Sequence, residues 1–217
     1  MQISTAFAYP DEQGQIIASS ALIDEDTKVK MINEISSKII PELTKAAELI
    51  PLEETSIVAL DWMNGRRRTP DANQNLKGVI SGLNLGSDAP RIFRALVEAT
   101  AFGSKAIVDR FISEGVRIDG VIALGGVVKK SPFVMQIVCD VLNMPIKVAR
   151  SEQACALGTA MAAAVVAGVY PNISEAQKKM GGGFEKTYTP IPTNVARYAK
   201  LYEKYVALGK VIEFGLK

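Results

Sequence analysis

Residues 119–136 read DGVIALGGVVKKSPFVMQ, and this stretch carries the clearest local signals in the chain. Its first six residues form a short, mostly apolar run, which is typical of a buried strand. Gly125-Gly126 ends the run, and Ser131-Pro132 is typical of a helix start, with the proline in the first turn. The stretch therefore predicts a strand, a glycine turn, a short loop over 127–130 and a helix that reaches about Leu142.

Similar units lie on both sides of this stretch. Short apolar runs predict strands at 56–60, 78–83 and 145–149, and helical spacing of apolar residues predicts helices at 88–113, 154–167, 174–180 and 193–212. A glycine loop, Gly181–Gly183, separates the last two helices. Because strands and helices alternate between residues 78 and 168, we expect an α/β domain with helices on both faces of a short sheet.

Residues 1–55 form an N-terminal segment distinct from the lobe predicted for 56–217. Apolar residues at three- and four-residue spacing in this segment predict a helix over 27–49. Proline cannot donate a backbone hydrogen bond inside a helix, so Pro41 predicts a kink or a division into two helices.

Composition and charge exclude several classes of function. Of the 217 residues, 48% are hydrophobic and 22% are charged, which is enough for one sizeable core. The formal net charge is +2, and the only basic run, Arg66–Arg68, lies among turn-forming residues and is expected to be solvated. We therefore expect no nucleic-acid partner. The longest apolar stretch, Ala154–Val169, is too short and too rich in small residues to span a membrane, so we expect no membrane partner.

The absence of histidine removes the commonest general base and most zinc sites, and no metal ligand is assigned. Cys139 and Cys155 lie in apolar helical patterns and are predicted to be reduced core thiols. Together with the lack of a signal-peptide pattern, they favour the cytoplasm. Asp61 and Asp119 are interpreted as loop or cap carboxylates, and Glu98 as the structural partner of a nearby arginine.

The glycine turn is the best candidate for a binding site. Glycines let a backbone approach a ligand closely, and ligands of open α/β sheets gather at the carboxyl ends of strands. Ser131 can cap the following helix, and its hydroxyl can also meet a ligand. A plain tight turn followed by a common helix start explains the same residues, and the spacing alone leaves both interpretations open. The pattern is neither a Walker A loop nor a G-x-G-x-x-G fingerprint.

Several motifs in order resemble those of the FGGY carbohydrate kinases. Val121–Gln136 and Cys139–Ile146 are similar to that family's adenosine motif, and Ser151–Met161 to the small-residue helix that follows it. Upstream, Gly78–Glu98 resembles a second family signature, from which Arg91 and Leu96 depart.

The resemblance implies the later part of an actin-like, ribonuclease-H-like ATPase lobe and an enzyme that uses ATP with Mg²⁺. In that family the Gly-Gly turn lies against the adenosine and α-phosphate, and the residue at the helix start reaches the adenine. Carried over, these cofactor-binding positions are Gly125, Gly126 and Ser131.

Two runs, Val58–Arg66 and Ser151–Gly158, resemble the branch of the family that phosphorylates L-ribulose to L-ribulose 5-phosphate in arabinose breakdown. A kinase for another sugar or polyol, such as xylulose or glycerol, is the first alternative. A stand-alone, non-catalytic nucleotide-binding or scaffold module is the second.

The family's two phosphate loops, its sugar-binding residues and its catalytic aspartate have no counterpart in residues 1–55. The resemblance therefore implies a C-terminal piece that is inactive alone, with no catalytic residue of its own. L-ribulose, and most of the contacts to magnesium, would belong to preceding parts. A lobe without its first strands keeps an unpaired sheet edge, so we also expect a homo-oligomer.

Overall fold

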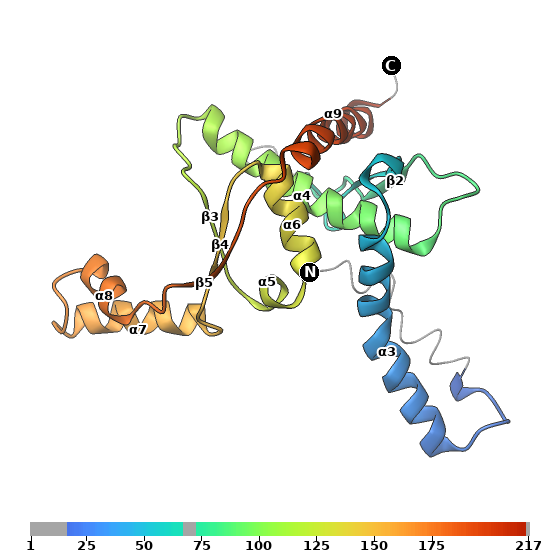
Figure 1. Ribbon diagram of the computed structural model, residues 1–217, viewed down its shortest axis with the longest axis horizontal. Coiled ribbons are helices and arrows are strands. Elements are labelled where there is room, and N and C mark those ends of the chain that lie inside the picture. Colours follow the sequence, from blue (N-terminus) through green and yellow to red (C-terminus); the bar gives the residue numbers. More distant parts are fainter. Residues whose placement is uncertain (1–16, 67–72, 216–217) are drawn as a thin grey trace. The chain divides into compact units, whose positions relative to one another are not determined.

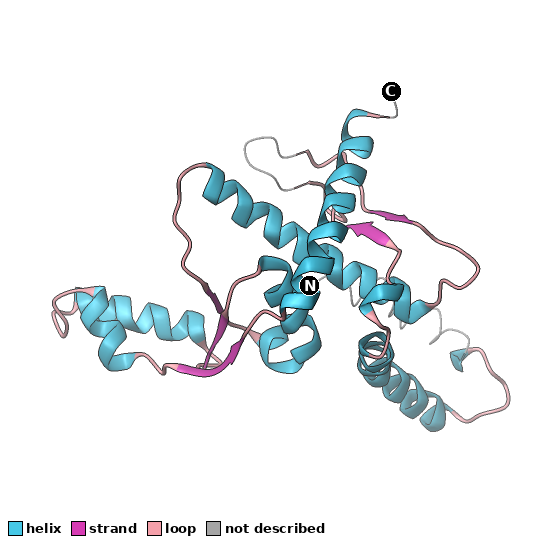
Figure 2. Cartoon of the chain, turned by 45° about the horizontal axis from the view of Figure 1, so that its top comes forward, coloured by secondary structure: helices cyan, strands magenta, loops and turns pink. Residues whose placement is uncertain are grey.

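The computed structural model describes residues 17–66 and 73–215, which form two compact units (Figures 1 and 2). Unit 1 contains the described residues up to Ile107 together with those from Arg197 onward, and unit 2 spans Val108–Ala196. Residues 1–16 of the predicted N-terminal segment, and Arg67 and Arg68 of the basic run, lie outside the described residues.

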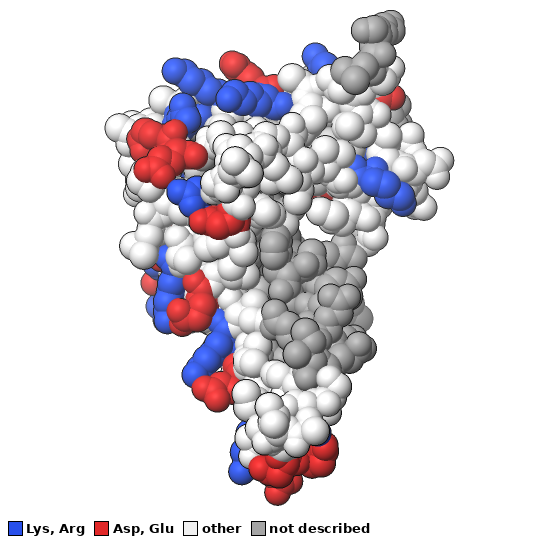
Figure 3. Space-filling view, turned by 90° about the vertical axis from the view of Figure 1, so that its right-hand side faces the viewer, with Lys and Arg blue, Asp and Glu red and all other residues white. Residues whose placement is uncertain are grey.

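Unit 1 begins with the long helix α3 (Glu25–Glu48), whose first turn is capped by Asp24. The Thr27 N–H donates to Asp24 Oδ1 at 3.0 Å, so the helix starts two residues before the predicted boundary. Pro41 lies within one continuous helix, and the predicted division into two helices is wrong. Lysine and glutamate side chains pair along α3, and blue and red side chains alternate on the face shown in Figure 3.

The core of unit 1 joins a small sheet to the helix α4 (Ala89–Ser113). After the short 3₁₀ helix η1 (Leu52–Glu54), β1 (Val58–Leu60) and β2 (Val79–Ser81) form an antiparallel pair with Ala59 opposite Ile80. Buried apolar side chains from β1 and α4 close this core. The last helix, α9 (Pro192–Phe214), brings three tyrosines against Phe102 of α4, with ring centroids 5.5–6.3 Å apart.

Unit 2 is built on a three-stranded sheet in the order β3 (Val121–Ala123), β4 (Ile146–Ala149), β5 (Phe184–Tyr188). β3 and β4 are parallel, and β5 runs antiparallel to β4. The five-residue helix α5 (Gly126–Lys130) and the helix α6 (Pro132–Leu142) connect β3 to β4. α6 buries Met135 and Cys139 against the sheet, whereas α7 (Ala154–Val166) and α8 (Ile173–Met180) pack on each other.

The fold class is the predicted mixture of helices and small sheets, but its sheets differ in detail from the prediction. The strands expected at 78–83 and 119–124 belong to two separate sheets. The connection between the last two helices, for which no strand was predicted, contains β5. Cys139 is buried as predicted, but Cys155 is exposed because α7 buries only Met161. None of the described helices combines the length with the hydrophobicity that a membrane-spanning segment requires.

Candidate functional site

Gly125 forms the corner at the end of β3. Its backbone has φ 100° and ψ 175°, a conformation that is essentially restricted to glycine. A Cβ atom at this position would meet nothing within 4 Å. The backbone conformation therefore requires glycine here, and packing does not.

Gly126 is the first residue of α5, and it is exposed. Its φ lies outside the left-handed region, and a Cβ atom would meet nothing within 4 Å. Neither conformation nor packing in the described chain explains a glycine at this position. A bare Cα beside open space is what close approach of a ligand to the backbone requires. The structure also places a single helical turn where the sequence predicted a loop over 127–130.

Ser131 separates α5 from α6 and caps α6. Its Oγ accepts a hydrogen bond from the Val134 N–H at 3.4 Å, as the sequence predicted for a helix cap. A serine hydroxyl also has one O–H donor, which can meet a second partner. The structure thus places Gly125 and Gly126 at the start of one short helix and Ser131 at its end, all within unit 2.

Lys129 is a residue of this turn that the sequence did not single out. Its Nζ donates to the backbone oxygen of Arg150 at 2.9 Å, and it lies 3.3 Å from Glu185 and 3.7 Å from Glu152. These partners follow Lys129 by more than twenty residues, so no local pattern could have identified them.

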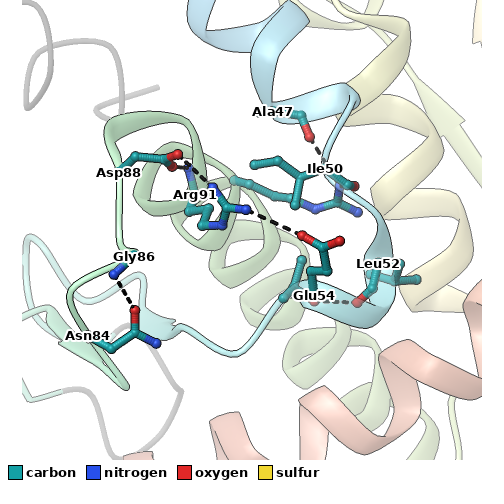
Figure 4. A network of polar contacts seen from close by, with 10 residues as sticks. Ala47, Ile50, Leu52, Glu54, Asn84, Gly86, Asp88 and Arg91 are labelled. Carbon is teal, nitrogen blue, oxygen red and sulfur yellow. Dashed lines mark hydrogen bonds and ion pairs between the residues drawn. The ribbon is translucent and has the colours of Figure 1, made fainter.

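A cavity of about 520 Å³ lies in unit 1 and is lined by residues between 50 and 98. Figure 4 shows its polar wall, in which Arg91 bridges Asp88 at 2.6 Å and Glu54 at 3.3 Å, and Asn84 Oδ1 accepts from the Gly86 N–H at 2.8 Å. Its arginines already pair with carboxylates, so the wall presents no unbalanced charge that would select a ligand. None of the predicted site residues lines it.

The carboxylates considered as alternatives have structural partners. Asp61 accepts a hydrogen bond from the Tyr205 hydroxyl at 2.7 Å, and burial raises the pKa of Asp61. Asp119 is exposed and lies 2.7 Å from Arg117. Glu98 is the predicted arginine partner: it accepts from Arg94 Nε at 2.8 Å, and burial raises the pKa of Glu98. Their interpretation as structural groups agrees with these contacts.

The prediction of a solvated basic run is wrong for Arg66. Its side chain is only 9% exposed, because it pairs with Glu213 and its guanidinium lies 5.9 Å from the centroid of the Trp62 ring. Trp62 itself is buried, so its ring serves as a packing anchor. In the described part of the chain, no group of three or more acidic or cysteine side chains could hold a metal ion.

Comparison with known families gives one match over most of the chain. Residues 11–167 match the model of the "FGGY family of carbohydrate kinases, C-terminal domain". A ribulokinase from Vibrio parahaemolyticus is 51% identical over 83% of this chain and 32% of its own length. A ribulokinase from Bacillus licheniformis is 43% identical over 76% of this chain and 31% of its own length. The chain thus spans about a third of the curated relatives that it matches.

Solved structures show the same fold at lower identity. A ligand-bound xylulose kinase from Lactobacillus acidophilus superposes with a TM-score of 0.71 at 24% identity, covering 80% of this chain and 34% of that enzyme. A gluconate kinase from the same organism gives a TM-score of 0.71 at 23% identity, and the match covers 92% of this chain and 38% of that enzyme. Such identities establish a shared fold and leave the substrate open.

Proposed function

This chain belongs to the FGGY family of carbohydrate kinases, and from that premise we propose that it supplies the adenosine-binding part of an ATP-dependent L-ribulose kinase. Gly125 and Gly126 would lie against the adenosine and α-phosphate, and Ser131 would reach the adenine. Two free cysteines among the described residues support a cytoplasmic location.

The observation that carries this proposal is the bare Cα of Gly126. The conformation of Gly125 already explains why the turn contains one glycine. Gly158 is also exposed, has no unusual φ and faces open space, but it lies inside α7. Gly126 instead follows β3 at its carboxyl end, where ligands of α/β sheets gather, and a bare Cα there lets a ligand come closer than a side chain allows.

We expect ADP with Mg²⁺ to bind the parent chain and not the Gly126→Asp variant. The aspartate would place a side chain and a negative charge where the nucleotide lies. Gly126→Ala, which adds only a methyl group, should weaken binding to a smaller extent. Isothermal titration calorimetry measures all three affinities. Gly158→Asp is the matched control, since a Cβ atom there also meets nothing within 4 Å and the residue is exposed in the same unit.

Equal ADP affinity in the parent chain and in Gly126→Asp would contradict the site. Thermal denaturation of each variant separates loss of binding from loss of fold, because no atom of the described chain opposes a side chain at position 126.

We also expect a coupled assay with ATP and L-ribulose to show no phosphoryl transfer by the parent chain, because phosphoryl transfer depends on groups around the γ-phosphate that residues 1–55 do not supply.

L-ribulose is proposed over xylulose or glycerol on the basis of sequence likeness. Relatives named ribulokinase reach 51% and 47% identity, whereas a xylulose kinase and a glycerol kinase of known structure match at 24% and 20%. No residue of this chain is assigned to the sugar. Magnesium is proposed to be held mainly by parts outside this chain.

We propose that the chain self-associates through the outer edge of β3. Among the described strands β3 pairs only with β4, and Ile122 and Leu124 beside this edge are 59% and 52% exposed. Unpaired edges with apolar side chains pair with other chains. Sedimentation velocity at increasing concentration should show a dimer, which Ile122→Lys weakens and the control Leu85→Lys, at another exposed leucine, does not. A monomer at every concentration would contradict the proposal.

A further inference from the structure

We infer that Lys129 is a positioning residue, which holds the Gly125-Gly126 turn in place for the nucleotide by tying α5 to the ends of β4 and β5. The inference rests on the proposed nucleotide site and adds a residue to it. Lys129 is not proposed to touch the nucleotide.

The turn is anchored at two points. At its start, Gly125 is separated by one residue from β3, which is paired with β4. At its end, Lys129 Nζ donates to the Arg150 backbone oxygen at 2.9 Å, just beyond β4, and lies 3.3 Å from Glu185 of β5. The Arg150 N–H donates in turn to the Gly183 oxygen at 3.1 Å, which joins the ends of β4 and β5. One ammonium group therefore connects α5 to two strands that are distant from it in sequence.

Apart from Lys129, α5 is held by Val128, which packs partly buried against the core of unit 2. The helix contains only five residues and buries none of them completely, and a helix of one turn is unstable in isolation. The Lys129 side chain is only 26% exposed, whereas the adjacent Lys130 is exposed. A partly buried ammonium group that is paired with a carbonyl and a carboxylate contributes more to stability than a solvated ammonium group. Lys129 therefore adds polar ties to the packing of Val128 in setting the position of the Gly126 backbone.

The partners of Lys129 predict a graded series. Glu185 is the nearer carboxylate and its side chain is 36% exposed, whereas the Glu152 side chain lies farther away and is 81% exposed. Exposed ion pairs contribute little. Glu185→Gln should therefore weaken nucleotide binding more than Glu152→Gln does. Lys129→Met should weaken it more than either of them.

The test is calorimetric titration of the full chain and its variants with ADP and Mg²⁺, and separately with adenosine. Lys129→Met should lower the affinity for both ligands by roughly three- to tenfold, which is the factor that corresponds to the net free energy of one hydrogen bond. Lys129→Arg should recover part of the loss. Lys147→Met removes an exposed lysine of β4 that lies over the Phe184 ring, and it should leave both affinities unchanged.

The two ligands distinguish positioning from charge. Weakened ADP binding with unchanged adenosine binding would overturn the inference, because it would mean that Lys129 attracts phosphate. Unchanged binding of both ligands in Lys129→Met would also overturn it, while the loss in Gly126→Asp would leave the nucleotide site standing. If Lys129→Met does not fold, Glu185→Gln provides the same test. No binding of either ligand by the parent chain would overturn both proposals.

Discussion

Replacement of Glu98 by alanine is expected to lower the free energy of unfolding by about 3–5 kcal/mol, the cost of breaking a buried ion pair from one side. Glu98 is 2% exposed and Arg94 is 6% exposed, so the alanine variant would leave a buried guanidinium without its carboxylate. Urea denaturation followed by the fluorescence of Trp62, the only tryptophan in the chain, measures the change in unit 1.

The effect is large because Arg94 also connects distant segments of unit 1. Its guanidinium donates to the backbone oxygens of Ala47 and Ile50 at the end of α3, and to the Tyr198 hydroxyl of α9 at 3.4 Å. Losing Glu98 removes the group that fixes Arg94 for these contacts. Glu98→Gln, which retains an oxygen acceptor of similar shape, should cost less than Glu98→Ala.

The control for Glu98 is Glu34→Ala in α3. Glu34 pairs with Lys38 at a spacing of four residues, the same spacing that separates Arg94 and Glu98, but both side chains are more than 60% exposed. This variant should leave the denaturation midpoint nearly unchanged, since exposed pairs contribute little. A loss below about 1 kcal/mol in Glu98→Ala, the level of an exposed pair, would mean that the Arg94–Glu98 pair does not act as a buried pair.

The second large effect is expected in unit 2, where Asp140→Ala should cost about 3 kcal/mol or more, since each hydrogen bond to a charged group is worth roughly 1.5–3 kcal/mol. Asp140 is 1% exposed, and its carboxylate accepts from Gln136 Nε2 at 2.9 Å, the Ile191 N–H at 2.8 Å and Asn194 Nδ2 at 2.8 Å. Alanine would leave these donors without their acceptor in the interior.

Hydrogen exchange is the suitable measurement for this variant, because Trp62 lies in unit 1. Amides of α6, and those around Ile191, should exchange faster in Asp140→Ala than in the parent chain. Asp119→Ala removes an exposed carboxylate from the same unit and serves as the control. Equal exchange in the two variants would show that the three contacts of Asp140 do not stabilise unit 2.

The local part of this fold could be predicted from sequence. The strand that ends at Gly125-Gly126 and the helix that follows Ser131-Pro132 both occur in the structure, with Ser131 as the cap. Each of these features depends on residues within a few positions of one another, and propensity and capping act over that range.

The parts that could not be predicted depend on contacts between distant residues. β5 has four exposed residues followed by one buried residue, so its sequence lacks the apolar alternation of a strand, and pairing with β4 determines its structure. The burial of Arg66 depends on Glu213, and the tie of Lys129 depends on Arg150 and Glu185. The nucleotide site itself stays a prediction, since its support is the open space at Gly126 and the family resemblance.

The two cysteines differ in a way that makes the chain suitable for optical distance measurement. Burial raises the pKa of the Cys139 thiol to about 11, so it remains protonated and unreactive at neutral pH, whereas Cys155 is exposed. A maleimide dye would therefore attach at Cys155, in unit 2. Trp62, in unit 1, is a natural fluorescence donor for an acceptor at that position. Energy transfer between them would report the separation of the two units, and its change when a nucleotide is added, without any engineered residue.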